Sequence, residues 1–388
     1  MATSPNFNWP EPDNTDLVKN GALAIRTAVN AIDTSLVDLK GGTTGQVLAK
    51  ASNTDMDFVW AADAGAPTSL GFAAGKNKII NGEFDIWQRG TSISVPNASW
   101  TYGPDRFAAY SAFSAGSSTF SQQTFTPGAA PVSGYETPFF ARLTCGSTAT
   151  FFQIEQRIED VRTFAGQTAT VSFWAKSSAT PTVKITTYQN FGTGGSSGVN
   201  TDGSNFALTS TWTRYTATLS IPSISGKTIG TNSALNVGLV HVSGGINSAT
   251  IDIWGVQMEE GSTATAFQTA TGTIQGELAA CQRYYYRFTA DGAYSLFGTG
   301  SASSTTNAYT LNPIPVTMRV APHSLDYSTI ALYDGVSVIA VTSASLLYND
   351  RNVGAVGMAV ASGLTQFRPY LVLSNNSTSA FLGFSAEL

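Results

Sequence analysis

Residues 213–221 read TRYTATLSI, and this stretch shows the pattern that decides the fold. Apolar side chains alternate with polar ones at every second position, which is typical of a β-strand with one buried and one exposed face. Similar runs recur between residues 171 and 253, separated by turn-rich segments such as GTGGSSGVNTDGSN at residues 192–205. Many short strands with no helix between them predict an antiparallel β-sandwich over residues 76–270.

Residues 271–388 are predicted to form a second, smaller β domain. The run ALYDGVSVIA at residues 331–340 contains Asp334-Gly335, a strong signal for a two-residue hairpin turn. The segment ELAACQRYYYRF at residues 277–288 is expected to join the two β domains. The predicted fold class is therefore mainly β.

Residues 17–40 are predicted to form a helix, with Asn14 or Thr15 as its cap and Gly41-Gly42 as its end. β-Branched residues at the d-type positions of a heptad repeat favour three or more strands, so we predict a trimeric coiled coil. A single helix packed on the chain's own β domain is the alternative. The apolar positions, spaced 4-3-4-3-4-3, form a heptad seam of Val18, Ala22, Ile25, Val29, Ile32, Leu36 and Leu39.

Residues 1–16 are rich in Pro, Asn and Asp and lack the apolar content of a core. We predict that this segment docks onto another protein through Phe7 and Trp9, and a disordered tail is the alternative. The segment shows no basic region followed by an apolar run, so no signal peptide is expected. Residues 61–75 are expected to be a linker, because they are small and turn-rich.

The composition argues against several classes of partner. Charged residues make up only 12% of the chain, the net charge is −5, and Lys and Arg are scattered singly. Nucleic-acid binding needs clustered cations, so no such surface is predicted. No apolar run approaches the roughly 18 residues of a membrane span. The two cysteines, Cys145 and Cys281, are predicted to be small buried apolar residues.

Four motifs carry a resemblance to a known family: NKIINGEFDIWQRG at residues 77–90, YGPDRF at 102–107, WGVQMEEGSTATA at 254–266 and ELAACQRYYY at 277–286. They resemble the jelly-roll domains, similar to carbohydrate-binding modules, of bacteriophage tail-fibre and other minor virion proteins. The segment that begins GGTTGQVLAK within residues 41–75 resembles a short repeat of phage fibres.

This resemblance implies a virion protein that is assembled in the host cytoplasm and attached to other tail or head proteins through its N-terminus. It implies a jelly roll over residues 76–270, a homotrimer, and host surface polysaccharide as the ligand. A tail fibre is the first expectation. A purely structural head-fibre or tail-junction protein is the alternative. Within the motifs, Trp87 and Trp254 are assigned to the core, and Arg89, Asp105 and Arg106 are expected to form an ion-pair cluster, by inference from the sequence.

No catalytic site is predicted. The two histidines, His241 and His323, have no ligand pair at zinc spacing. Glu259 and Glu260 are adjacent on a strand and must point to opposite faces. A glycan depolymerase, which needs two facing carboxyl groups, is the less favoured alternative. Glu155 and Glu159 would be its carboxyl groups, but they alternate with Arg157 and Arg162 and are interpreted as a salt-bridged surface.

Aromatic side chains carry the functional prediction, because sugar rings stack their C–H faces on them. Trp100, Tyr102, Tyr188, Phe191 and Trp212 are the candidate glycan-binding residues. A structural calcium ion is a secondary expectation, since the resemblance implies that the first and last strands lie side by side. Glu83, Asp85 and Asp252 are its candidate ligands.

Overall fold

The structure is a computed structural model that describes residues 2–5, 9–11, 17–44, 46–54, 56–62, 73–348 and 350–388. It contains two compact units, residues 1–71 and 72–388. Phe7 and the predicted caps Asn14 and Thr15 lie outside the described residues. None of the helices in the described ranges is long and apolar enough to cross a membrane.

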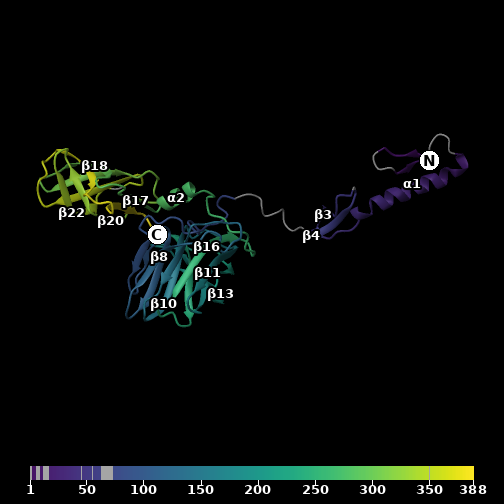
Figure 1. Ribbon diagram of the computed structural model, residues 1–388, viewed down its shortest axis with the longest axis horizontal. Helices are drawn as coiled ribbons and strands as arrows, with labels where there is room; N and C mark the ends of the chain where they lie inside the picture. Colours follow the sequence, from purple (N-terminus) through teal and green to yellow (C-terminus); the bar gives the residue numbers. More distant parts are fainter. Residues whose placement is uncertain are drawn as a thin grey trace. The chain divides into compact units, whose positions relative to one another are not determined.

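In the described part of the N-terminal unit, the α-helix α1 is accompanied by two short hairpins (Figure 1). The α-helix is shorter than the predicted range 17–40. It is α1 and covers only Gly21–Ser35, with the 3-10 helices η1 (Val18–Asn20) before it and η2 (Val37–Leu39) after it. The hairpins are β1 (Ala2–Thr3) with β2 (Pro10–Glu11), and β3 (Gln46–Lys50) with β4 (Phe58–Ala62).

The predicted heptad seam lies on a side of α1 that is exposed. Ile25 and Val29 are 59% and 55% exposed, whereas Ala24, outside the seam, is the one buried residue of α1. Trp9 is half-buried, and its indole N–H donates to the Ser35 hydroxyl at 2.9 Å. Trp9 is therefore already bound by the chain's own helix.

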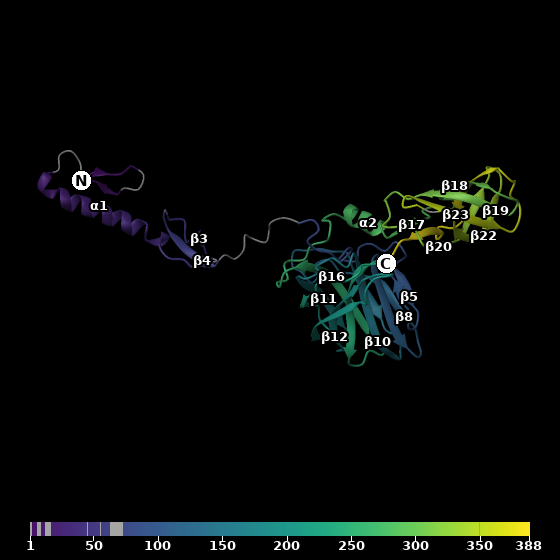
Figure 2. The same ribbon diagram turned by 180° about the vertical axis from the view of Figure 1, so that it is seen from behind.

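The sandwich consists of two six-stranded antiparallel sheets packed face to face (Figure 2). The first sheet, in spatial order, contains β13 (Val199–Ala207), β12 (Thr182–Asn190), β15 (Ala234–Ser243), β10 (Ala149–Glu159), β7 (Phe107–Phe113) and β6 (Thr101–Tyr102). The second contains β14 (Thr213–Ser220), β11 (Thr168–Ser177), β16 (Thr250–Glu260), β9 (Phe139–Thr144), β8 (Ser118–Thr124) and β5 (Ser92–Val95).

The burial of the strands confirms the alternation in β14 and corrects it in β11. Tyr215, Ala217 and Leu219 of β14 are buried and their neighbours on the strand are not. In β11 both faces are buried, because side chains from other segments, among them Trp254 and Phe267, cover the outer face. The core between the sheets includes Phe84, Phe120, Phe152, Phe173 and Leu235.

The C-terminal β domain contains a three-stranded sheet and a closed barrel. Its three-stranded sheet contains β17 (Tyr285–Thr289), β25 (Phe381–Ser385) and β20 (Ser324–Ser328). Its closed barrel contains β18 (Leu296–Ala302), β19 (Asn307–Pro313), β23 (Val353–Val360), β22 (Val338–Leu346), β21 (Ile330–Tyr333) and β24 (Pro369–Ser374).

The predicted hairpin within residues 331–340 is present, but its loop has four residues and not two. Tyr333 pairs with Val338, so residues 334–337 form the turn, and Gly335 has a φ of +93°. The Asp334 carboxylate accepts the N–H groups of Val336 and Ser337 and so stabilises the longer loop.

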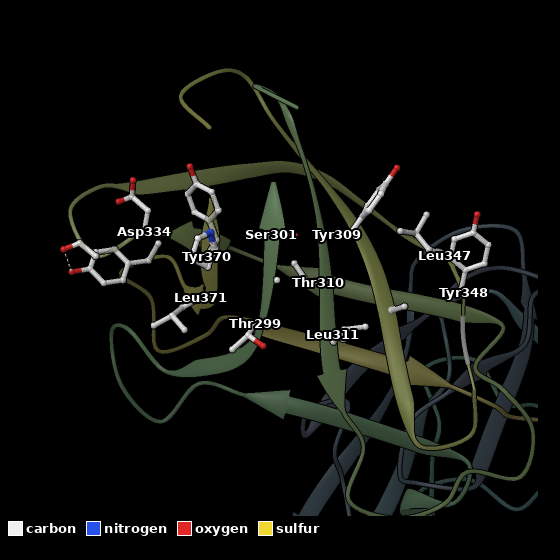
Figure 3. Close-up of a pocket in the computed structure, with 15 residues that line it drawn as sticks. Thr299, Ser301, Tyr309, Thr310, Leu311, Asp334, Leu347, Tyr348, Tyr370 and Leu371 are labelled. Carbon is white, nitrogen blue, oxygen red and sulfur yellow. Dashed lines mark hydrogen bonds between the residues drawn. The ribbon is translucent and has the colours of Figure 1, made fainter. Parts of the chain in front are cut away.

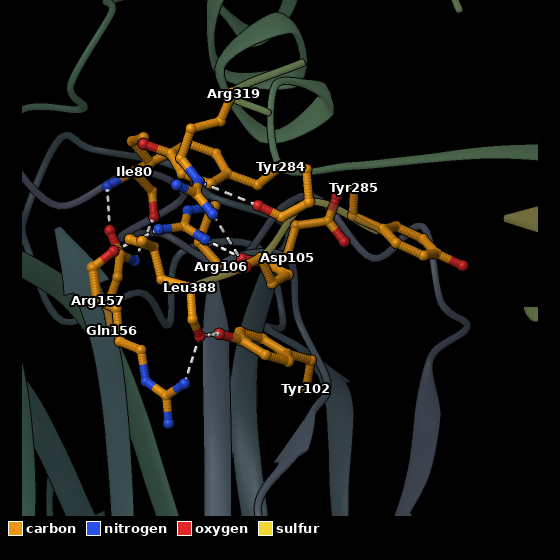
Figure 4. A network of polar contacts seen from close by, with 12 residues as sticks. Ile80, Tyr102, Asp105, Arg106, Gln156, Arg157, Tyr284, Tyr285, Arg319 and Leu388 are labelled. Carbon is orange, nitrogen blue, oxygen red and sulfur yellow. Dashed lines mark hydrogen bonds and ion pairs between the residues drawn. The ribbon is translucent and has the colours of Figure 1, made fainter. Parts of the chain in front are cut away.

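The segment that joins the two β domains begins with α2 (Ile274–Gln282). Its buried Glu277 accepts the N–H of Asn81 at 2.7 Å, so the helix is held to the start of the sandwich. Figure 4 shows the polar network at the other side of this junction, where strand residues of the sandwich meet the last residues of the chain.

The ion-pair cluster expected at Arg89, Asp105 and Arg106 is confirmed, with Glu387 as an additional member. Arg106 is 1% exposed and forms an ion pair with Glu387. Arg89 lies 3.8 Å from Asp105 and 3.4 Å from Glu387. Buried charges of this kind need such partners, since an unpaired one costs several kcal/mol. The cluster therefore fixes the C-terminal domain to the sandwich.

The assigned core residues are also confirmed. Trp87 and Trp254 are 9% and 0% exposed. Cys145 and Cys281 are both buried and free, which agrees with their interpretation as small apolar residues.

Candidate functional site

A groove of about 390 Å³ lies on the outer face of the first sheet, which we call the open face. Strands β10, β15 and β12 form its floor, and in each of them every second side chain points outward. Gly238 occupies the centre of this floor, opposite Glu155 on one side and Thr186 on the other. The lining residues are Trp100, Gln153, Glu155, Arg157, Lys184, Thr186, Tyr188, Asn200, Asp202, Asn236 and Val240.

Two aromatic side chains stand at the groove with part of each ring exposed, 38% for Trp100 and 41% for Tyr188. The Trp100 ring packs on Tyr110 at 5.4 Å between centroids and lies 5.8 Å from the Arg157 guanidinium. The Tyr188 ring runs close to the backbone of Gly198, where an added Cβ would lie 2.1 Å from the tyrosine oxygen. Both rings are therefore fixed by packing on one side and open on the other.

Two ion pairs cross the floor of the groove. Glu155 is buried and accepts from the Arg157 Nε at 2.8 Å and from the Gln153 amide at 3.0 Å. Burial raises the pKa of Glu155, and the charge of Arg157 opposes that shift. The structure corrects the interpretation of Glu155 as a surface carboxylate, because its side chain lies within the sheet's polar layer.

The second ion pair joins Asp202 to Lys184, from neighbouring strands. The Thr186 hydroxyl also donates to Asp202 at 2.7 Å, and the Asn200 amide donates at 2.8 Å. The hydrogen bond from Lys184 is the main cause that lowers the pKa of Asp202 to about 2. Asp202 is therefore ionised at any ordinary pH.

Asn236 adds an unsatisfied group to the floor. Its side-chain oxygen is buried and has no hydrogen-bond partner within the described parts of the chain. A buried acceptor without a donor costs about 1–3 kcal/mol, so a hydroxyl or water that donates to it would be bound favourably.

The structure brings together two of the five predicted aromatic candidates, Trp100 and Tyr188, and places the other three elsewhere. Phe191 is 1% exposed and cannot present a ring face to a ligand. The Tyr102 hydroxyl donates to the Leu388 carbonyl at 3.2 Å, at the junction with the C-terminal domain, and burial raises its pKa to about 12. Trp212 packs on Phe125 and Phe140 at the opposite sheet.

Two of the three predicted calcium ligands, Glu83 and Asp85, lie beside each other, and the third, Asp252, is paired with basic side chains. Asp252 is bound by Arg142 at 2.6 Å and by Lys176 at 3.6 Å. Glu83 accepts from the Tyr135 hydroxyl at 2.7 Å. No group of three or more His, Cys, Asp or Glu side chains suited to a metal ion occurs among the described residues.

The carboxylates considered for a depolymerase are also separated by their partners. Glu159 pairs with Arg283 at 2.8 Å and not with Arg162, which pairs with the neighbouring Asp160 at 2.9 Å. Glu259 is buried and Glu260 is exposed, as their positions on one strand require.

Sequence reasoning missed most of the polar residues of the groove, among them Gln153, Lys184, Asn200, Asp202 and Asn236. A signal was present in β12, where Lys184, Thr186 and Tyr188 alternate with Val183, Ile185 and Thr187. The pairing of β12 with β13 and β15 could not be read from that alternation, and the pairing is what assembles the site.

No family model and no curated protein sequence matches the chain. Solved structures with a similar fold include carbohydrate-binding modules and a phage tailspike domain. The xylan-binding domain CBM22-1 of Paenibacillus barcinonensis is 12% identical over 50% of this chain and 99% of its own, with a TM-score of 0.29.

The enzymatically active domain of tailspike protein 4 from bacteriophage CBA120 is 16% identical, over 48% of this chain and 21% of its own, with a TM-score of 0.30. A Stig cyclase of Fischerella is 11% identical over 45% of this chain and 100% of its own, also with a TM-score of 0.30. Similarities this weak do not select a function, so the groove itself must carry the argument.

Proposed function

We propose that the chain binds a saccharide in the groove on the open face. The observation that carries this proposal is the combination of two half-exposed aromatic rings, Trp100 and Tyr188, with a floor of amide and hydroxyl groups. Sugar rings need both, because their C–H faces stack on aromatic rings while their hydroxyl groups need hydrogen-bond partners. The unsatisfied oxygen of Asn236 is one acceptor in place for such a hydroxyl.

The charges of the groove favour binding over cleavage. Glu155 and Asp202 lie in one groove, and the pKa of Glu155 is raised while that of Asp202 is lowered. Glycosidases use two carboxyl groups whose pKa values differ in this way. However, hydrogen bonds from neighbouring side chains occupy both oxygens of each carboxylate. Neither group is free to protonate or attack a glycosidic bond, so a glycan depolymerase is the second candidate and not the first.

The wider setting that we propose is a homotrimeric phage virion fibre, with a tail fibre as the first choice. Support comes from the resemblance of the four sequence motifs and from the exposed seam of α1, which a trimeric coiled coil would bury. The N-terminal unit would attach to other virion proteins, and the β domains would face host surface polysaccharide. A structural fibre without a receptor is the alternative.

A glycan array probed with the full chain tests the binding. We expect Trp100→Ala and Tyr188→Ala each to weaken binding at least tenfold, while Tyr294→Ala, which removes a ring that is 53% exposed outside the groove, leaves it unchanged. Silence of the unchanged chain across the array would support the structural role. Release of reducing sugar from host polysaccharide, lost in Glu155→Gln, would establish the depolymerase.

Light scattering tests the trimer. The full chain should have three times the mass of one chain, and Ile25→Asn with Val29→Asn should lower it. A full chain of monomeric mass would refute the coiled coil and leave the saccharide proposal standing.

A further inference from the structure

A second hollow, of about 850 Å³, lies on the outer wall of the C-terminal barrel. Figure 3 shows the residues that line it, which come from strands β18, β19, β21, β23 and β24 and from the loops beside them. Thr299 pairs with Leu311 on one side and with Leu371 on the other, so three outward side chains form one row across the sheet. Ser301 and Tyr309 form the next row.

The hollow arises from a contrast in side-chain size. Thr299, Ser301 and Ala355 are small, whereas the surrounding Tyr309 and Leu311 are large and each 58% exposed. Such large apolar exposure is unusual on a soluble surface and marks binding sites. A volume in this range is also typical of small-molecule sites.

No charge is free in this hollow. Asp334 is the one ionisable acid that lines it, and its carboxylate pairs with Arg368 at 3.2 Å. The same carboxylate accepts the backbone N–H groups of Val336 and Ser337. A charged ligand would find no unpaired counter-ion, so the hollow suits a neutral one.

The polar groups of the hollow are mainly hydroxyls, those of Thr299 and Ser301 on its wall and those of tyrosines at its rim. Figure 3 shows the hydroxyl ends of Tyr309 and Tyr348 pointing away from the barrel, and Tyr348 is 91% exposed. The hydroxyls of Tyr333 and Tyr370 are already bonded, to the Gly335 carbonyl and the Thr365 N–H. A ligand would therefore meet leucine and alanine carbons together with the Thr299 and Ser301 hydroxyls inside, and tyrosine hydroxyls at the rim.

We propose that this hollow binds a neutral saccharide with one apolar side, of the 6-deoxyhexose class. Such a sugar carries a methyl group where other hexoses carry a hydroxyl. The methyl can lie on Leu311 and Leu371 without burying an unpaired hydroxyl, which would cost about 1–3 kcal/mol. The remaining ring hydroxyls reach Thr299 and the two rim tyrosines. The proposal is independent of the groove on the sandwich.

Saturation-transfer NMR with the full chain tests this proposal with two sugar probes that differ only in the substituent at C6. Methyl α-L-rhamnopyranoside has a C6 methyl, and methyl α-L-mannopyranoside has a hydroxyl there. We expect the rhamnoside to bind at least fivefold more tightly, with the strongest saturation at its C6 methyl. Tyr309→Ala should weaken its binding at least tenfold.

Tyr294→Ala, which removes a ring that is 53% exposed and lines neither the hollow nor the groove, is the matched variant and should leave rhamnoside binding unchanged. Loss in Tyr188→Ala but not in Tyr309→Ala would overturn the proposal and move the sugar to the groove. Equal binding of both probes, or no binding, would overturn it as well. A change in the solution mass of the chain on Tyr309→Ala, without an effect on the rhamnoside, would identify the hollow as a contact between copies instead.

Discussion

The two outer faces of the sandwich carry aromatic residues and differ in what covers them. On the outer face of the second sheet, which we call the covered face, Trp174 and Trp254 pack together at 5.3 Å between centroids, and Phe267 lies over them. Val132 and Tyr135 close the same cluster. On the open face no such layer from the described residues lies over Trp100 and Tyr188, which remain 38% and 41% exposed. An aromatic side chain on an outer face is therefore core or binding surface according to the loops around it.

The largest expected effect separates the two faces by stability. Trp254→Ala should lower the free energy of unfolding by about 3–5 kcal/mol, because Trp254 is fully buried among four aromatic rings. Tyr188→Ala should cost much less, about 1 kcal/mol or less, since its side chain is already 41% exposed. Urea unfolding followed by fluorescence measures both.

Equal costs for the two substitutions would mean that the open face is also covered in solution. A phenylalanine at position 254 is the control, because Trp254→Phe keeps most of the apolar area and should recover a large part of the loss.

A smaller effect is expected from Gly198→Ala, which tests how the open face positions its ring. The added methyl group would lie 2.1 Å from the Tyr188 oxygen, so the ring must turn away from its present position. We expect saccharide binding to weaken about tenfold, which is about 1.4 kcal/mol, with little change in stability. Isothermal calorimetry with an array-selected glycan measures it.

Gly245→Ala is the matched control, because nothing lies within 4 Å of an added Cβ there. Unchanged binding in both variants would show that the position of the Tyr188 ring does not matter to the ligand.

The local sequence pattern predicted strands, but it did not predict which outer faces of those strands are buried by other segments of the chain. The alternation in β14 predicted which of its side chains are buried, because every second side chain of a strand points to the same face of the sheet. The same pattern failed in β11, whose outer face is buried by residues about ninety positions later in the chain. Tyr102 was misplaced for the same reason, since its partner Leu388 lies 286 residues away.

The candidate site was predicted in part. Trp100 and Tyr188 were selected for ring type and lie at one groove, while Phe191, selected on the same ground, is in the core.

The predicted two-residue turn at Asp334-Gly335 is a four-residue loop in the structure, because the pairing of Tyr333 with Val338 sets its length. Strand register decides such features, and a single sequence does not show it.

A difference between the two faces is also expected in how their stability responds to pH. Beside the covered face, where the Tyr135 hydroxyl donates to Glu83, burial and the neighbouring Glu83 raise the pKa of Asp85 from its ordinary 3.8 to about 7. The folded chain then holds a proton that the unfolded chain releases, so stability should fall as pH rises from about 4 to 7 and level off above. Asp85→Asn should flatten part of that fall. Burial also raises the pKa of Asp105 to about 7, so a slope of the same sign should persist.

Asp202→Asn on the open face is the matched variant for this measurement. The pKa of Asp202 is lowered to about 2, so its contribution is present at every pH above its ordinary range and is lost only as the pH falls towards 2. Urea unfolding at pH 5 and pH 8 should therefore show a changed slope for Asp85→Asn and an unchanged slope for Asp202→Asn. The reverse result would mean that the carboxyl group that stays protonated in the folded chain is Asp202 and not Asp85. The two faces would then not differ in their electrostatics as we expect.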